Sequence, residues 1–243
     1  MEQKELALDT INEILKKFYE QGVLFSNERQ FQLELAFELK EIYENVHLEV
    51  LDYLDSEKKY IDIVVDIGNN KLVAIELKYT TRDKNILYKT TNRNVYTFKQ
   101  GAGDLRRFHY LKDVERLEGL LHKPNVFGME GKEVIKGFAI IMTNDNYHSQ
   151  DGKKCKNGKI IGDTDYFNVA LNNGRTISVS EQPLTIRTSG YEGKKINLKH
   201  EYTCKWNVYE LDQNETKLII EGKESSMPYE TYPFRYMILE IKP

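Results

Sequence analysis

Three charged side chains lie within two runs of β-branched and aliphatic residues that otherwise look buried. Asp62 belongs to the run 61–67, whereas Glu76 and Lys78, which share one face of a strand because they are two apart, belong to the run 71–79. Burying an ionised group is costly unless the group is paired or binds a metal, and two close carboxylates favour a divalent cation between them. Oxygen ligands with spare positions suit Mg²⁺, which polarises a phosphoryl oxygen and lowers the pKa of a bound water. The three residues therefore predict metal-assisted phosphodiester hydrolysis, with Mg²⁺ or Mn²⁺ as the cofactor.

The turn between the two runs decides which face Asp62 takes. The Gly-Asn-Asn sequence at 68–70 is typical of a hairpin. If it forms a three-residue loop, Ile67 pairs with Lys71 and Asp62 lies directly opposite Glu76, with Cβ atoms about 5 Å apart. A two-residue loop would turn Asp62 to the other face, and a bulge would also move the register. The meeting of Asp62 and Glu76 therefore depends on the turn.

The spacing of Asp62, thirteen further residues and then Glu76-Leu77-Lys78, after a helix that carries glutamates, resembles the PD-(D/E)xK nuclease superfamily. The resemblance covers about residues 26–145, and Ile61 stands where the family usually has proline. It implies an α/β protein with the restriction-endonuclease-like mixed β-sheet flanked by helices. It also implies that Asp62 and Glu76 are metal ligands and that Lys78 is the general base or positions the attacking water. The implied activity is that of a Mg²⁺-dependent endonuclease acting on double-stranded DNA, in a restriction or defence setting.

The segment before the hairpin has the pattern of an amphipathic helix. Ser26 or Asn27 can cap its start, Glu28 lies in its first turn, and apolar residues repeat at helical spacing: Phe31, Leu35, Leu39 and Ile42. Glu34 and Glu38 border this apolar stripe. In many superfamily members a glutamate on this helix reaches toward the metal, and the resemblance assigns that role to Glu34, with Glu38 in reserve. The alternative is that these glutamates form a solvated helix edge.

A second helix is expected in the stretch 100–117. Some superfamily members carry a glutamine near the scissile phosphate on the helix after the ExK strand, and Gln100 resembles that element. Arg106 and Arg107 would then grip the nucleic-acid backbone. Alternatively, Asp104 and Arg107 pair on the helix surface, since they are three residues apart.

The stretch 80–99 is basic inside an otherwise mildly acidic chain. It contains Arg82, Lys84 and three further basic residues but only one acid, Asp83. Basic residues beside a metal site would neutralise phosphates, so Arg82 and Lys84 are expected to bind nucleic acid. A flexible solvated loop would explain the same composition without any ligand.

Composition excludes several classes of protein. The chain has 243 residues, a hydrophobic content of 40% and a net charge of −3, so it can bury a full core but does not have the basic footprint of a protein that coats nucleic acid. Its two cysteines, Cys155 and Cys204, make neither a disulfide framework nor a zinc site. The charged N-terminus lacks the apolar region of a signal peptide, and no stretch has the length of a membrane span. We therefore expect a cytoplasmic protein.

The chain divides into two parts that differ in composition and in their expected secondary structure. Residues 1–145 are expected to form the nuclease core, and residues 146–243 a β-rich elaboration of the same domain whose last apolar run, 234–241, returns a strand to the core. The elaboration could instead be a strand array for target recognition. Restriction-like nucleases often act as dimers, so a homodimer is one expectation, although the sequence contains no dimer stripe. Two alternatives stay open: a non-cleaving nucleic-acid-binding protein of the same fold, and a structural protein in which the charges form a buried ion-pair network.

Overall fold

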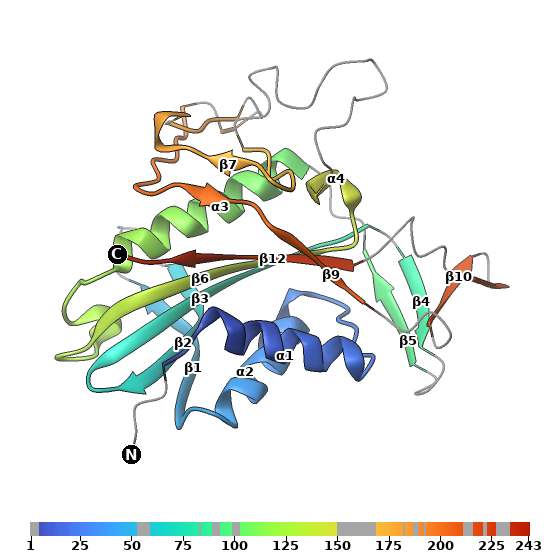
Figure 1. Cartoon of the computed structure of the whole chain (residues 1–243), viewed down its shortest axis with the longest axis horizontal. Helices are drawn as coiled ribbons and strands as arrows, with labels where there is room; N and C mark the ends of the chain where they lie inside the picture. The colour runs from blue at the N-terminus through green and yellow to red at the C-terminus, as the bar shows by residue number, and fades with distance from the viewer. Residues whose placement is uncertain are drawn as a thin grey trace.

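A six-stranded mixed sheet is the centre of the fold, as the computed structural model shows (Figure 1). The structure describes residues 5–52, 59–82, 84–88, 93–98, 103–149, 169–181, 183–186, 190–191, 193–210, 216–220, 223–226 and 234–243. The strand order in the sheet is β1-β2-β3-β6-β12-β9. Its strands are β1 (Asn45–Asp52), β2 (Lys59–Gly68), β3 (Lys71–Thr80), β6 (Glu133–Thr143), β12 (Phe234–Ile241) and β9 (Trp206–Tyr209). Only β3 and β6 are parallel among these neighbours.

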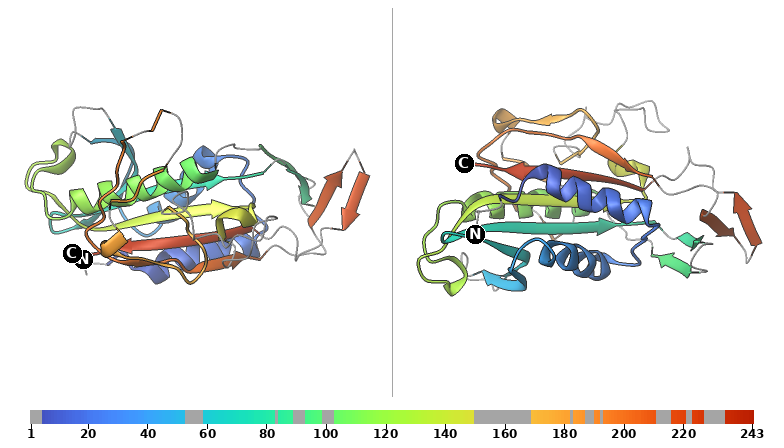
Figure 2. Two further views of the ribbon diagram at one scale, coloured as in Figure 1. Left: turned by 90° about the horizontal axis from the view of Figure 1, so that it is seen from above. Right: turned by 60° about the horizontal axis from the view of Figure 1, so that its bottom comes forward.

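Helices cover both faces of this sheet, so the chain has a mixed α/β fold. Figure 2 shows α1 (Leu8–Glu20) and α2 (Glu28–Lys40) on one face and α3 (Gly103–Leu120) on the other. Each face has its own apolar core, one packed against α1 and α2 and the other against α3. The chain passes from β3 through α3 to the parallel strand β6, as a crossover between parallel strands requires. In the described ranges, no helix is both long and apolar enough to cross a membrane.

Local sequence explains the start and the buried face of α2. The Asn27 side chain accepts a hydrogen bond from the Gln30 backbone N–H at 2.9 Å, so Asn27 is the N-cap. The apolar residues at helical spacing, Phe31, Leu35 and Leu39, are buried against the sheet. The amphipathic helix predicted for this segment is therefore confirmed.

The two faces of β3 differ in chemistry. Ile75, Leu77 and Tyr79 belong to the core under α1 and α2, whereas Ala74 belongs to the core under α3. Because side chains alternate along a strand, Glu76 and Lys78 point to the α3 face. The strand therefore places its charged residues opposite the helix that follows it.

The β2–β3 hairpin turns by a different route from the expected one. Asn69 and Asn70 both have positive φ, 50° and 61°, as a two-residue turn requires, and Gly68 pairs with Lys71. The predicted pair between Ile67 and Lys71 is therefore wrong. An irregularity between Asp66 and Gly68 absorbs Ile67 as an extra residue and restores the register that a three-residue loop would have produced.

A second, four-stranded sheet has the order β11-β10-β4-β5 and lies beyond the ends of β3 and β6 (Figure 1). Its strands are β4 (Lys84–Tyr88), β5 (Arg93–Thr97), β10 (Thr216–Ile220) and β11 (Lys223–Ser226). The basic stretch 80–99 therefore contributes a paired hairpin to this sheet rather than an open loop. The short elements are α4 (Asn146–Ser149), β7 (Thr176–Ile177), β8 (Tyr202–Thr203), and the 3₁₀ turns Val126–Gly128 and Val179–Glu181.

Candidate active site

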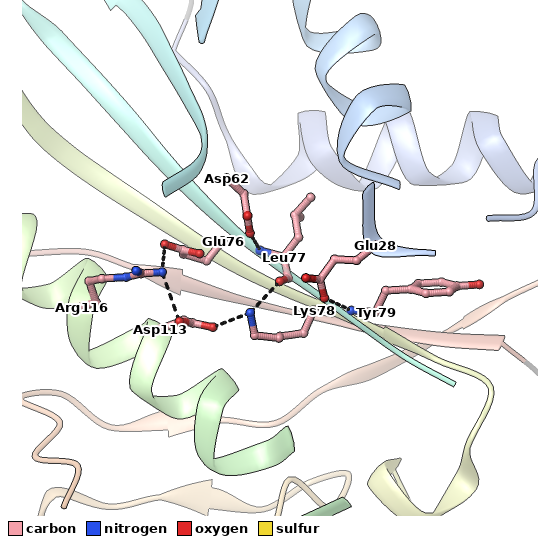
Figure 3. A network of polar contacts seen from close by, with 8 residues as sticks. All are labelled: Glu28, Asp62, Glu76, Leu77, Lys78, Tyr79, Asp113 and Arg116. Atoms are coloured by element: carbon pink, nitrogen blue, oxygen red, sulfur yellow. Dashed lines mark hydrogen bonds and ion pairs between the residues drawn. The ribbon is translucent and has the colours of Figure 1, made fainter. Parts of the chain in front are cut away.

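Six ionisable side chains meet around the second half of β3 (Figure 3). They come from β3, β2, α2 and α3: Glu76, Lys78, Asp62, Glu28, Asp113 and Arg116. Four of them are carboxylates and two are cations, so negative charge exceeds positive charge when every group is ionised. We call this set the charged cluster. Such an excess of negative charge favours the binding of a further cation.

Asp62 is held against β3 by a backbone hydrogen bond. Its Oδ2 accepts from the N–H of Leu77 at 2.7 Å, and Leu77 lies between Glu76 and Lys78. The strand pair Ile63–Ile75 is the last one before this point, and one further step in the same register places Asp62 opposite Glu76. The structure thus brings Asp62, Glu76 and Lys78 together on one side of the hairpin.

Helix α3 supplies two further members of the charged cluster that sequence reasoning missed. Asp113 Oδ2 lies 2.9 Å from Lys78 Nζ, and Asp113 Oδ1 lies 3.2 Å from Arg116 Nη2. The same guanidinium nitrogen forms an ion pair with Glu76. Asp113 and Arg116 are three residues apart, which puts them on one face of the helix. That spacing of opposite charges, on the helix after β3, is the signal that could have identified them.

Burial changes the proton affinity of the carboxylates. It raises the pKa of Glu76 well above its ordinary value, and the charge of Asp113 adds to this rise while Arg116 opposes it. Burial also raises the pKa of Asp62, against the opposing hydrogen bond from Leu77. The ionised form of each carboxylate is therefore costly unless a positive charge stands beside it.

The pKa of Lys78 is also raised, but the cause is neighbouring negative charge and not burial. Burial alone would lower the pKa of Lys78, but the carboxylates of Asp113 and Glu28 outweigh burial and raise it above its ordinary value. Lys78 is therefore protonated at neutral pH. A protonated lysine can orient water and stabilise negative charge, whereas a general base must first lose its proton.

The glutamate that α2 brings to the charged cluster is Glu28 and not Glu34. Glu28 Oε2 accepts a hydrogen bond from the Tyr79 N–H at 2.8 Å, and Lys78 lowers the Glu28 pKa while burial, the larger effect, raises it. Glu34 instead lies near Tyr209 of β9, whose pKa burial and nearby charge raise. The reserve residue, Glu38, pairs with Lys17 of α1 at 2.6 Å. The first turn of α2, which carries Glu28, lies at the end of β3, so the structure does not support the predicted role of Glu34.

The two predicted arginines at the start of α3 lie near His148 of α4. Arg107 is 0% exposed. Its predicted contact with a nucleic-acid backbone is therefore not supported, because the side chain has no access to solvent. Arg106 is half-buried, and its role stays a prediction. Gln100 lies outside the described residues.

The other two predicted nucleic-acid contacts lie toward the second sheet. Arg82 Nε is 2.9 Å from Asp145 Oδ1, and the Arg82 side chain is 52% exposed. The Arg82 backbone N–H donates to Asn144 Oδ1 at 2.6 Å, which ties the end of β3 to the end of β6. Lys84 is half-buried at the start of β4. Neither residue belongs to the charged cluster, so the expected nucleic-acid contacts of Arg82 and Lys84 lie away from that cluster.

A cavity of about 800 Å³ opens beside the charged cluster. Lys78, Asp113 and Arg116 line it, together with other residues of α3 and residues near Tyr191. Its volume is in the range of cavities that bind small molecules. The polar end of Lys78 can therefore be reached by a ligand.

The oxygen donors suit a largely hydrated cation. In the part of the chain that the structure describes, no group of three or more His, Cys, Asp or Glu side chains is arranged to hold a metal ion. Asp62 and Glu76 still offer two neighbouring carboxylates, and Mg²⁺ is commonly held by one or two carboxylates plus water and phosphate oxygens. The donor set therefore fits Mg²⁺ or Mn²⁺ better than a closed zinc site.

Comparison of the chain with models of protein families, with curated proteins and with solved structures finds no match.

Proposed function

We propose that this chain is a metal-dependent nuclease of the PD-(D/E)xK superfamily that hydrolyses phosphodiester bonds in DNA. The observation that carries the proposal is the meeting of Asp62, Glu76 and Lys78 on adjacent strands beside an open cavity. The mixed sheet with helices on both faces is the arrangement that the restriction-endonuclease-like fold requires. A restriction or defence enzyme is the setting that best fits a compact nuclease of this kind.

The residues of the charged cluster have distinct roles in this proposal. Asp62 and Glu76 would hold Mg²⁺ or Mn²⁺, which would polarise the phosphate and supply a metal-bound water. Lys78, whose ammonium pairs with Asp113, would position the attacking water or act as the general base, the two roles that the resemblance implies. Arg116, on α3, balances the charge of Glu76 through an ion pair. Glu28 adds a carboxylate near Lys78.

A cleavage assay tests the proposal. The protein is incubated with supercoiled plasmid and with single-stranded circular DNA, in Mg²⁺, in Mn²⁺ and in EDTA. Cleavage is expected only with metal, and Asp62→Asn or Lys78→Ala should reduce it at least about 100-fold, the usual cost of removing a preorganised charge partner. Asp66→Asn is the matched control, because Asp66 lies on the same strand but pairs with Lys132 outside the charged cluster.

The ion pairs also favour a second candidate, a nucleic-acid-binding or structural protein that does not cleave. Lys78 with Asp113, and Arg116 with Glu76, already satisfy much of the buried charge without a metal. In that case Mg²⁺ leaves the melting temperature unchanged and both DNA substrates stay intact. If the protein cleaves DNA and a chelator abolishes the cleavage, this candidate is excluded.

A further inference from the structure

The cavity beside the charged cluster has a positive wall that the proposed reaction does not use. Of the thirteen lining residues that the structure describes, seven are lysine or arginine and two are acidic. Five of the seven lie outside the charged cluster, and we call them the basic groove: Lys59, Lys112, Lys123, Lys194 and Lys195. Since the whole chain has a net charge of −3, this concentration of positive charge does not follow from composition. It points to an anionic ligand.

Part of the basic groove belongs to the second half of the chain and is held against α3. Glu115 Oε1 accepts a hydrogen bond from the Asn197 N–H at 2.7 Å. Glu118, which is buried, accepts from the Lys199 N–H at 2.8 Å. These bonds fix the stretch that carries Lys194 and Lys195. The groove is therefore formed before any ligand arrives, which reduces the ordering cost of binding.

Several of these lysines have their charge available for a ligand. Lys112 pairs with Glu115, but Lys123, Lys194 and Lys195 are exposed and have no ion-pair partner among the residues that the structure describes. Lys194 Nζ lies 4.5 Å from the centre of the Tyr191 ring. Ammonium groups without an ion-pair partner bind phosphates and release the counterions of the nucleic acid.

Aromatic side chains line the cavity together with the lysines. Tyr191 packs edge-to-face on Phe108 with ring centroids 5.9 Å apart, and its hydroxyl lies 2.9 Å from His109 Nε2. All three residues line the cavity. Phe108 is buried and supports Tyr191, whereas Tyr191 and His109 are half-buried and can offer a ring to a base. Positive charge beside such rings is the combination that binds single-stranded nucleic acid, because phosphates meet the charges and bases stack on the rings.

The dimensions favour one strand over a duplex. About 800 Å³ accommodates a ligand of drug size, such as a few nucleotides, but not a double helix. Glu76 is only 2% exposed and does not line the cavity, whereas Lys78, Asp113 and Arg116 of the charged cluster do, so a phosphate must enter the cavity to approach the cluster from this side. A separated strand can do this, whereas a duplex backbone at the surface cannot.

We propose that the basic groove binds one strand of a nucleic acid and directs its backbone toward Lys78 and the rest of the charged cluster. The inference rests on the proposed function for what happens to the strand at the cluster. Binding in the groove itself requires no metal, so it can be measured separately from cleavage.

The test measures fluorescence anisotropy of a labelled, unstructured oligodeoxynucleotide in EDTA, with a duplex of the same length as competitor. Lys123→Glu combined with Lys195→Glu should weaken binding roughly tenfold or more and reduce the salt slope of log Kd by about 1.4, for two lost phosphate contacts. Gly119→Glu should act in the same direction. A Cβ at this helical glycine meets nothing within 4 Å, so the added carboxylate enters the groove without a clash.

Two controls match these variants. Lys40→Glu combined with Lys205→Glu changes the net charge equally at exposed sites outside the groove and should leave binding almost unchanged. Gly119→Ala should retain full binding. The inference is overturned if the groove and control variants lose the same binding affinity, or if the duplex competes as well as the single strand. It is also overturned if the protein binds inorganic polyphosphate but not the oligonucleotide.

The same variants separate the two proposals. If the groove variants weaken oligonucleotide binding but Mg²⁺ produces no cleavage, the groove proposal is supported and the nuclease proposal is contradicted. If cleavage depends on metal but the groove variants bind the oligonucleotide as well as the parent protein does, the nuclease proposal is supported and the groove proposal is contradicted.

Discussion

The guanidinium of Arg116 pairs with the carboxylate of Glu76, a residue that is 2% exposed and lies on the strand β3 under helix α3. Asp113 shares the same guanidinium nitrogen at 3.2 Å. The positive charge of Arg116 therefore stands between two carboxylates that would otherwise repel each other. Removing one partner of a buried pair leaves an uncompensated charge, which costs much more free energy than the pair itself contributes.

Arg116→Met should therefore lower the free energy of unfolding in EDTA by about 3 kcal/mol. Mg²⁺ should restore more stability to this variant than to the parent protein, because the cation then meets carboxylates that have lost their partner. Urea unfolding with and without Mg²⁺ measures both effects. Lys112→Met, which removes an exposed pair on the same helix, should change stability by less than about 1 kcal/mol. If Mg²⁺ fails to stabilise either protein, Asp62 and Glu76 do not hold a metal.

Glu28 and Glu34 provide a matched comparison on one helix. Glu28→Gln keeps an oxygen that can accept from the Tyr79 N–H, so it removes charge near Lys78 without removing the hydrogen bond. We expect metal-dependent cleavage to fall by about tenfold or more, whereas Glu34→Gln should leave it unchanged. Initial rates on the preferred DNA substrate, with circular dichroism to check folding, measure the difference. A larger effect from Glu34→Gln would restore the original assignment.

This pair also shows which parts of the site the sequence could predict. Alternation along a strand and the position of the turn are local properties. They allow Asp62 to be placed opposite Glu76, although the structure reaches that register through a two-residue turn with a bulge and not through a three-residue loop. A helical wheel gives the direction of Glu34 around the helix axis but not which turn lies over the end of β3. That depends on how α2 crosses the sheet, which is a tertiary property.

The remaining members of the site are further apart in the sequence. Arg116 reaches Glu76 across 40 residues, and the loop that carries Lys194 meets α3 through a bond across 82 residues, from Asn197 to Glu115. Local spacing can mark Arg116 and Asp113 as a charged pair on the helix, but it does not specify which distant residue each of them meets. The basic stretch 80–99 was conspicuous in composition, yet the structure places its described residues in or beside the second sheet, away from the charged cluster.

His148 makes the free energy of unfolding depend on pH. Burial lowers its pKa to about 4 from an ordinary value of 6.5, and the nearby charges of Arg107, Arg82 and Arg106 act in the same direction, whereas Asp145 opposes them. Between pH 6.5 and 4 the unfolded chain binds a proton at His148 and the folded chain does not. Stability should therefore fall as the pH drops through this window, by about 3 kcal/mol in total.

His148→Gln removes this contribution to the pH dependence of stability. Its free energy of unfolding should vary less between pH 6.5 and pH 4 than that of the parent protein, as urea titrations at several pH values can measure. His122→Gln is the control, because His122 is exposed on the loop after α3. An unchanged pH dependence in His148→Gln would mean that other groups cause the acid sensitivity.

Glu118 joins α3 to the stretch that forms one wall of the basic groove. Its carboxylate accepts hydrogen bonds from the N–H groups of Lys199 and His200 and from the Tyr202 hydroxyl, at 2.8 to 3.0 Å. Glu118→Ala should lower the free energy of unfolding by about 3 kcal/mol, since the buried Tyr202 hydroxyl and two backbone N–H groups lose their acceptor. Glu118→Gln keeps one acceptor oxygen and should cost less.

Hydrogen exchange locates the effect of the Glu118 variants. The Lys199 and His200 amides should exchange faster in Glu118→Ala than in Glu118→Gln, while amides of the central strand β3 should keep their relative protection. Binding of the oligonucleotide in EDTA should weaken in the same order, because the lysines at 194 and 195 lose their fixed position. If exchange accelerates but binding does not change, the wall need not be rigid for the groove to hold a strand.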